Sequence, residues 1–205
     1  MNLDDRSPAA PPRDAYSRVT DAGRFWPLHA LALDLLARLG AEYEVSQFAA
    51  FQLLPDMHLF EHARPPVMLT PLTPEAAPLA VAFTMFPSLV VRCGRWFVES
   101  FPSCGCDACR ETSEGEGARF QTLVRDVVDG RFSEALGIPL FGAARLSWSL
   151  GDVTALPGHY GHGFRALSRA SARALRGDGP RTVTWRPWLV RGPLAAPVVE
   201  PVRAE

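Results

Sequence analysis

Lysine is missing from this sequence: all 21 basic residues are arginine, and 19 of the 205 residues are proline. We interpret both features as a GC-rich coding bias, so the arginine count alone does not argue for a function. The arginines are balanced by 22 acidic residues, which gives a formal net charge of -1. A chain so nearly neutral does not favour nucleic acid or an anionic membrane as its partner.

Long apolar runs are also missing. No stretch of the sequence approaches the roughly 18 apolar residues that a membrane-spanning helix needs, so we expect no membrane span. The N-terminal stretch MNLDDRSPAAPPR is acidic and proline-rich and lacks the apolar segment of a signal peptide. We therefore expect a cytoplasmic protein, and in that compartment clustered cysteines are more often metal ligands or catalytic groups than disulfides.

The motifs of several common enzyme classes do not occur. The sequence has no glycine-rich phosphate loop, no G-x-S-x-G and no H-E-x-x-H. Nucleotide-binding, serine-hydrolase and zincin activities therefore lose support. What the chain does have is 47% apolar residues, enough for a 205-residue chain to bury a substantial core as one domain.

The chain divides into three parts. We expect a disordered N-terminal tail over residues 1–15, a single α+β domain over 16–190, and a proline-rich C-terminal tail over 191–205.

Two helices are predicted within this domain. A leucine stripe with helical spacing follows Pro27, and Gly40 suits the position just beyond the helix end. The second helix begins with Ser113 and Glu116, which have the spacing of a capping box, and ends at Gly130.

The strand signals lie mainly between these two helices. Four apolar runs predict an antiparallel β-meander: PVMLT (66–70), LAVAFTMF (79–86), SLVVRC (88–93) and RWFVESF (95–101). Gly94-Arg95 reads as a two-residue hairpin turn between the last two runs. Further along, the patterns predict a strand at 144–150, a third helix at 164–177 and a strand at 181–185. The expected fold is therefore an α+β sheet with two or three packed helices.

Three of the four cysteines lie within six positions, in FPSCGCDACRE (101–111). Cys106 and Cys109 form a Cys-x-x-Cys pair, whose thiolates can reach one zinc ion from a single tight turn. Gly105 lets the backbone bend so that Cys104 can join them. Cys109 also precedes a predicted helix, whose N-terminal partial charge favours an ionised sulfur. The segment therefore predicts a metal knuckle that binds zinc, with copper(I) or no metal as the lesser alternatives.

The sequence offers several candidates for the fourth ligand. Cys93 should lie at the opposite end of the last meander strand, roughly 25 Å from Cys104 at about 3.3 Å per residue, and is excluded. The residues before the first meander strand, DMHLFEHARP, should emerge at the cysteine end. Within them His58 and His62 have an i, i+4 spacing, so either imidazole can complete the site.

Other groups remain open as the fourth ligand. His159 and His162 lie in a glycine-rich loop, and Asp107 and Glu111 are near the cysteines in the sequence. Water in the fourth position would turn a structural ion into a catalytic one.

The cysteine segment resembles a known signature. FPSCGCDACRE is similar to the FP-x-CGCDAC-[D]-E motif of a family of uncharacterised bacterial proteins, a domain of unknown function common in high-GC genomes. The similarity extends to TMFPSLVVR and to the helix after the cysteines, over about residues 16–190. The resemblance supports grouping the three cysteines and implies no catalytic role. Arg110 stands where the family has an acidic residue, which argues against a function that needs a carboxylate there.

Three functional hypotheses follow. The first is a structural zinc knuckle with a role in interaction with a protein partner. The second is a zinc-dependent enzyme with an open coordination position, in which His58 or His62 is a ligand or proton carrier. The third is a dithiol exchanger using Cys106 and Cys109, although the usual βαβ context is missing and the third cysteine invites scrambling.

The region after residue 160 is rich in arginine. Arg165, Arg169, Arg173 and Arg176 fall on one side of the predicted third helix. We interpret them as a solvated face rather than a nucleic-acid surface, because no aromatic residues are interleaved within the stripe. The sequence does not predict an oligomeric state.

Overall fold

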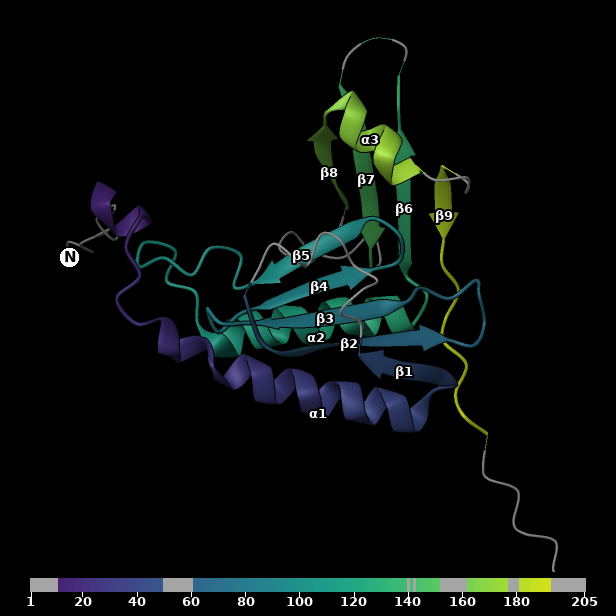
Figure 1. The fold of residues 1–205 in the computed structure, drawn as a ribbon, viewed down its shortest axis with the longest axis horizontal. Helices are drawn as coiled ribbons and strands as arrows, with labels where there is room; N and C mark the ends of the chain where they lie inside the picture. Colours follow the sequence, from purple (N-terminus) through teal and green to yellow (C-terminus); the bar gives the residue numbers. More distant parts are fainter. Residues whose placement is uncertain are drawn as a thin grey trace, which may run out of the picture.

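The computed structural model describes residues 11–49, 61–139, 141, 143–151, 162–176 and 181–192. Two antiparallel sheets and three α-helices make up these residues, which confirms the α+β class. Helices α1 and α2 lie alongside the first sheet, and the second sheet stands at one end of it with α3 (Figure 1). In the described ranges, no helix has the length and apolar character needed to cross a bilayer.

The first sheet is a five-stranded meander. Its strands follow each other in sequence order: β1 (Val45–Ala49), β2 (His62–Pro71), β3 (Leu79–Thr84), β4 (Leu89–Cys93) and β5 (Phe97–Phe101). The last four confirm the predicted meander. The sequence did not reveal β1, because four of its five residues are exposed and the strand has no apolar alternation.

The two long helices cover one face of this sheet. Helix α1 (Pro27–Glu42) begins at the predicted proline, but it continues through Gly40, which the sequence pattern predicts to lie just beyond its end. Helix α2 (Ser113–Val128) is capped by Thr112, whose side chain accepts the Gly115 N–H at 3.1 Å. The predicted cap at Ser113 is thus one residue late, since both threonine and serine can cap a helix and the sequence offers both at adjacent positions.

The second sheet has the strand order β8-β7-β6-β9. Its strands are β6 (Phe132–Gly137), β7 (Ala144–Leu150), β8 (His162–Leu167) and β9 (Thr182–Thr184). Strands β7 and β9 confirm the predictions, whereas β6 was not predicted. Helix α3 spans Arg169–Arg176 only.

The predicted helix over 164–177 is wrong in its first part. Phe164 pairs with Ser147 and Arg165 with Leu146 in the β7–β8 ladder. The arginine and alanine residues there have good helix propensity, but strand pairing in the sheet outweighs it. The arginine stripe is therefore divided, with Arg165 on a strand and the others on α3.

The turn between β4 and β5 joins the two sheets. Cys93 pairs with Phe97, so the loop has three residues rather than the predicted two, and Gly94 adopts φ +60°. The carboxylate of Glu134 on β6, only 1% exposed, accepts the backbone N–H groups of Arg95, Trp96 and Phe97 at 2.6, 2.9 and 3.1 Å.

Glu134 also accepts the indole N–H of Trp185 at 3.2 Å. Burial raises its pKa above the ordinary carboxyl value, while these hydrogen bonds act in the opposite direction. Four N–H donors converge on the two carboxylate oxygens of Glu134. A side chain that is itself a donor would leave some of these N–H groups without an acceptor.

We expect Glu134→Gln to lower the free energy of unfolding by about 2–3 kcal/mol, because its amide N–H₂ faces N–H donors and leaves them unsatisfied. Urea denaturation followed by circular dichroism measures the change. Ser133→Ala on the same strand is the matched control and should change stability by about 0.5 kcal/mol or less. A Glu134→Gln protein as stable as the wild type would contradict this role.

A buried histidine lies under the β3–β4 turn. The His29 ring makes edge contacts with Trp26 and Phe83, at centroid distances of 5.0 and 5.3 Å, and its Nε2 donates to the Ser88 carbonyl at 3.1 Å. Burial lowers its pKa; the Ser88 hydrogen bond opposes this effect, and the charge of Arg64 adds to it.

The stability of the fold should therefore depend on pH through His29. Since its pKa is lower in the folded state, the unfolded chain binds more protons below about pH 6.5, and the free energy of unfolding should fall as the pH drops from about 7.5 to about 5.5. His29→Gln should reduce this dependence in urea denaturation, whereas His162→Asn on exposed β8 should retain it. Equal slopes for wild type and His29→Gln would rule His29 out as the cause.

Candidate metal centre

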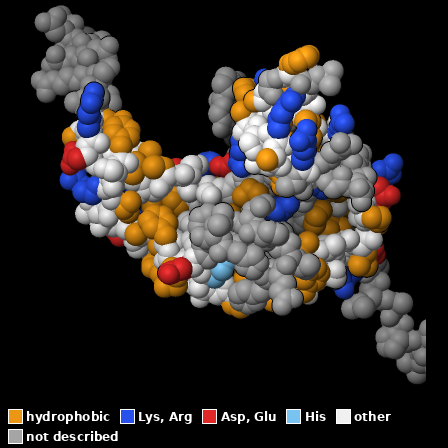
Figure 2. Space-filling view, turned by 45° about the horizontal axis from the view of Figure 1, so that its top comes forward, with side chains coloured by type: hydrophobic (Ala, Val, Ile, Leu, Met, Phe, Trp, Pro, Cys, Tyr) orange, Lys and Arg blue, Asp and Glu red, His pale blue; other side chains and the backbone are white. Residues whose placement is uncertain are grey.

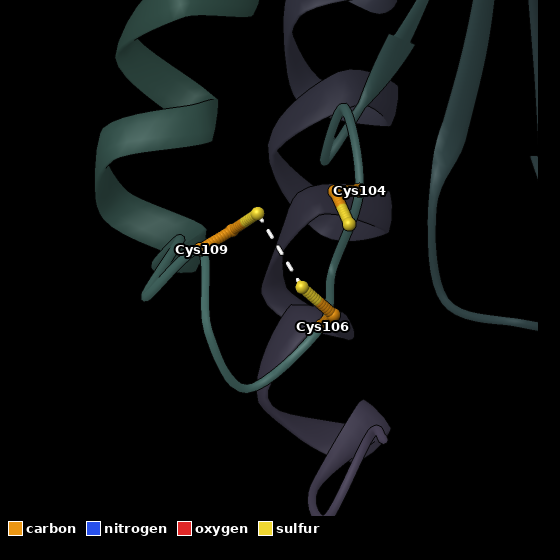
Figure 3. A group of neighbouring side chains, drawn as sticks. All are labelled: Cys104, Cys106 and Cys109. Atoms are coloured by element: carbon orange, nitrogen blue, oxygen red, sulfur yellow. Dashed lines mark hydrogen bonds between the residues drawn. The ribbon is translucent and has the colours of Figure 1, made fainter. Parts of the chain in front are cut away.

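The three clustered cysteines bring their sulfur atoms together at one end of the first sheet. All three Sγ atoms lie within 4.8 Å of one another, and those of Cys106 and Cys109 are 3.4 Å apart (Figure 3). A disulfide requires about 2.05 Å, so these are free thiols. Two thiolates on a tetrahedral zinc lie about 3.8 Å apart, because each Zn–S bond is about 2.3 Å. The observed separations therefore suit one shared ion.

The bend between Cys104 and Cys106 depends on glycine. Gly105 adopts φ +76°, and a Cβ at this position would lie 2.8 Å from the Phe86 ring. Any larger residue would meet both backbone strain and this ring. The predicted role of Gly105 in turning the chain agrees with this geometry.

One carboxylate holds the first half of the loop. Glu111 accepts the backbone N–H groups of Ser103, Cys104 and Gly105 at 3.1, 3.2 and 2.6 Å. Arg24 adds to this by donating to the carbonyls of Gly105 and Glu111, at 2.9 and 3.3 Å. The side chain of Glu111, considered above as a ligand, thus binds the loop backbone with its carboxylate.

The N-terminal segment holds the second half. It contains two short 3₁₀ helices, Arg13–Tyr16 and Ala22–Phe25. The N–H groups of Asp107 and Ala108 donate to the carbonyls of Arg18 and Ala15, at 2.9 and 3.2 Å. Residues 13–15, which fall within the predicted N-terminal tail, thus belong to the first of these helices and adjoin the cysteine loop.

The carboxylate of Asp107 completes this attachment. It accepts the backbone N–H and hydroxyl of Thr20 at 2.9 and 2.6 Å and the Arg18 guanidinium at 3.0 Å. These hydrogen bonds, those of Thr20 first, lower the pKa of Asp107 to about 2. Asp107 is therefore ionised and occupied by its partners near neutral pH.

The three thiols differ in burial and acidity. Cys106 is 3% exposed, while Cys104 and Cys109 lie at the surface. Hydrogen bonding to Cys104 is the largest cause that lowers the pKa of Cys106, and the backbone N–H groups of Cys109 and Ala108 also lower it. Hydrogen bonds with Cys106 and Cys104 raise the pKa of Cys109 to about 12. The protein thus stabilises negative charge on Cys106 first.

The other candidate ligands lie apart from this cluster. Cys93 is buried at the end of β4 that leads into the turn. The cysteine loop follows the other end of this strand pair, where Leu89 pairs with Phe101, which confirms that Cys93 is not a ligand of the cluster. His62 begins β2 opposite Thr84, at the cysteine end as predicted. Among the described residues, however, the cluster of potential ligands consists of the three cysteines and does not include His62.

The three remaining candidate histidine ligands are His58, His159 and His162. His58 and His159 lie outside the described residues. His162 begins β8 in the second sheet, where it pairs with Ser149. Sequence reasoning missed the contributions of Thr20 and Arg24, because both act through contacts more than 80 positions away and carry no local pattern.

Loss of the Asp107 carboxylate should loosen the N-terminal segment. We expect Asp107→Ala to increase tryptic cleavage after Arg18 several-fold, as measured by mass spectrometry over time. Asp14→Ala is the control: it removes an exposed ion pair to the same arginine and should have little effect. Equal cleavage of the two variants would mean that Asp107 does not anchor the segment.

The fold and the cluster together define an α+β protein with a surface group of three cysteines suited to a metal ion. The chain belongs to a family of unknown function, DUF6226, whose model matches residues 2–192. No curated protein and no solved structure shows significant similarity to the chain.

Proposed function

We propose that this protein binds one zinc ion through Cys104, Cys106 and Cys109, as a structural knuckle that presents a surface for interaction with another protein. The observation that supports this most strongly is the approach of three sulfur atoms to within 4.8 Å of one another. Three thiols so close together would repel each other if all were ionised, and a divalent cation bound among them would compensate that repulsion.

The loop is held by groups other than the thiols. Glu111 and Asp107 are occupied by backbone and side-chain donors, so the sulfurs remain available as ligands. An ion bound there would add its binding free energy to the stability of the folded loop. It would link β5, α2 and the N-terminal segment at a single point.

Zinc is our choice over copper(I), although both prefer thiolates and the ion bound in a cell depends on availability as well as affinity. A reducing compartment, which we take to be the cytoplasm, would keep the three thiols free for metal.

A zinc-dependent enzyme is the second candidate. The described residues bring three ligands together, and a fourth position open to water would allow catalysis. A surface groove of about 410 Å³ lies between the first turns of α1 and α2, beginning at Ser113 shortly after the cysteine loop. It is lined by Pro27, Leu28, Leu31, Ser113, Glu114, Gly117, Ala118 and Gln121.

The dithiol exchanger is a weaker candidate. The 3.4 Å separation of Cys106 and Cys109 would permit a disulfide after a small movement. Cys106 is buried, however, and exchange needs an accessible attacking sulfur. Reduced protein that binds no metal and forms a reversible Cys106–Cys109 disulfide would favour this activity over ours.

Elemental analysis of purified reduced protein should find about one zinc per chain. Cys106→Ser should lose most of this zinc, because it removes one of three ligands. Cys93→Ala, which changes the buried cysteine outside the cluster, should retain it. Metal content that is zero in the wild type or unchanged in Cys106→Ser would overturn the proposal.

Chelation provides an independent measurement on the same protein. Removing zinc should lower the midpoint of thermal unfolding of the wild type and should not affect Cys106→Ser. An identical melting curve before and after chelation of loaded protein would show that the ion has no structural role.

A further inference from the structure

The proposed zinc site is one ligand short within the described chain. Structural zinc sites are four-coordinate, and the cluster supplies three sulfur atoms. The nearest carboxylates of the loop, Asp107 and Glu111, already accept three hydrogen bonds each. The following inference rests on the proposed function and concerns the source of the fourth ligand.

Two of the three sulfur-bearing residues face outward. Cys104 and Cys109 are exposed, whereas Cys106 is buried against the loop. A second molecule can therefore reach the ion from the side of Cys104 and Cys109. A thiolate has more than one lone pair, so an exposed ligand of one ion can also bind a second ion.

Exposed apolar side chains surround the same end of the molecule. We call Tyr16, Val19, Trp26, Met85 and Phe86 the apolar collar; all five are large, hydrophobic and exposed. Hydrophobic side chains gather over this end, at the left of the view, in Figure 2. A patch of exposed apolar side chains on a folded protein is typical of an interaction site.

Contacts tie the collar to the cysteine loop. The Phe86 ring lies against Gly105 between the first two cysteines, and Met85 precedes it. Tyr16 and Val19 adjoin Ala15 and Arg18, whose carbonyls bind the N–H groups between Cys106 and Cys109. Apolar surface therefore flanks the thiols on two sides.

The charges around the thiols would not oppose self-association. Residues 11–26 and 101–112 contain four arginines and four carboxylates: Arg13, Arg18, Arg24, Arg110, Asp14, Asp21, Asp107 and Glu111. Two copies that meet at this end would thus bring together locally neutral surfaces.

We propose that two copies of this chain meet at the apolar collar and form a dinuclear zinc-thiolate cluster. Each ion binds the three cysteines of its own chain and one exposed cysteine of the second copy, which bridges both ions. Two chains supply three thiolates each, and with one bridging thiolate per chain each zinc reaches four sulfur ligands. The second copy thereby completes a coordination shell to which the described residues of one chain contribute three ligands.

The mass of the protein in solution tests this arrangement. Light scattering on metal-free, reduced protein should give the 22.4 kDa of one chain, and protein loaded with one zinc per chain should give twice that mass. Cobalt(II) in place of zinc reports the ligands, because the intensity of its thiolate charge-transfer absorption rises with the number of Co–S bonds. We expect four sulfur ligands per cobalt in the dimer.

Substitutions in the collar separate the two proposals. The double variant Val19→Asp, Met85→Asp should still bind one zinc per chain, but as a single chain whose cobalt spectrum shows three sulfur ligands. Phe164→Asp, at an exposed phenylalanine on the second sheet, is the matched control and should dimerise like the wild type.

Each result has a definite meaning. Zinc-loaded wild type with the mass of one chain would overturn the dimer and leave the metal site intact. A dimer that forms without zinc, or that persists in the collar variant, would also overturn this inference. Wild type that binds no zinc would overturn the proposed function itself.

Discussion

The geometry of the cysteine cluster depends on one interaction, the binding of three successive backbone N–H groups by the carboxylate of Glu111. These N–H groups belong to the residues that bend the chain around Gly105. Without an acceptor they would compete with the thiols for hydrogen-bond partners, and the sulfurs would have no fixed positions. With the acceptor in place, Cys104 and Cys106 are brought close to Cys109.

The same arrangement occurs at the other end of β5. Glu134 accepts the N–H groups of three consecutive residues, Arg95 to Phe97, just as Glu111 does for Ser103 to Gly105. Strand β5 is therefore bracketed by two turns that each wrap around a carboxylate. One carboxylate comes from the second sheet and joins it to the first, and the other comes from the approach to α2 and shapes the candidate metal site.

How much of this structure can be predicted from the sequence depends on how far apart in the chain the interacting residues are. The meander strands, the start of α1 at Pro27 and the Cys104 to Cys109 cluster follow from local patterns, and the structure has all of them. Strand β1 and the switch from strand to helix near residue 168 do not, because pairing with β2 and β7 decides them. Likewise Asp107 reads as a possible ligand in the sequence, and only its contact with Thr20 shows that it anchors the N-terminal segment.

The odd number of clustered thiols favours a metal ion over a disulfide as the chemistry of this site. A disulfide between any two of the three would leave the third without a partner, whereas an ion uses all three at once. The contacts of the loop point in the same direction, since the carboxylates of Asp107 and Glu111 and the N-terminal segment hold the backbone of the loop through contacts that do not use the sulfur atoms. These hydrogen bonds hold two exposed thiols and one buried thiol in reach of a single ion, and under the proposals above the apolar collar beside them is the surface at which that ion would join two chains.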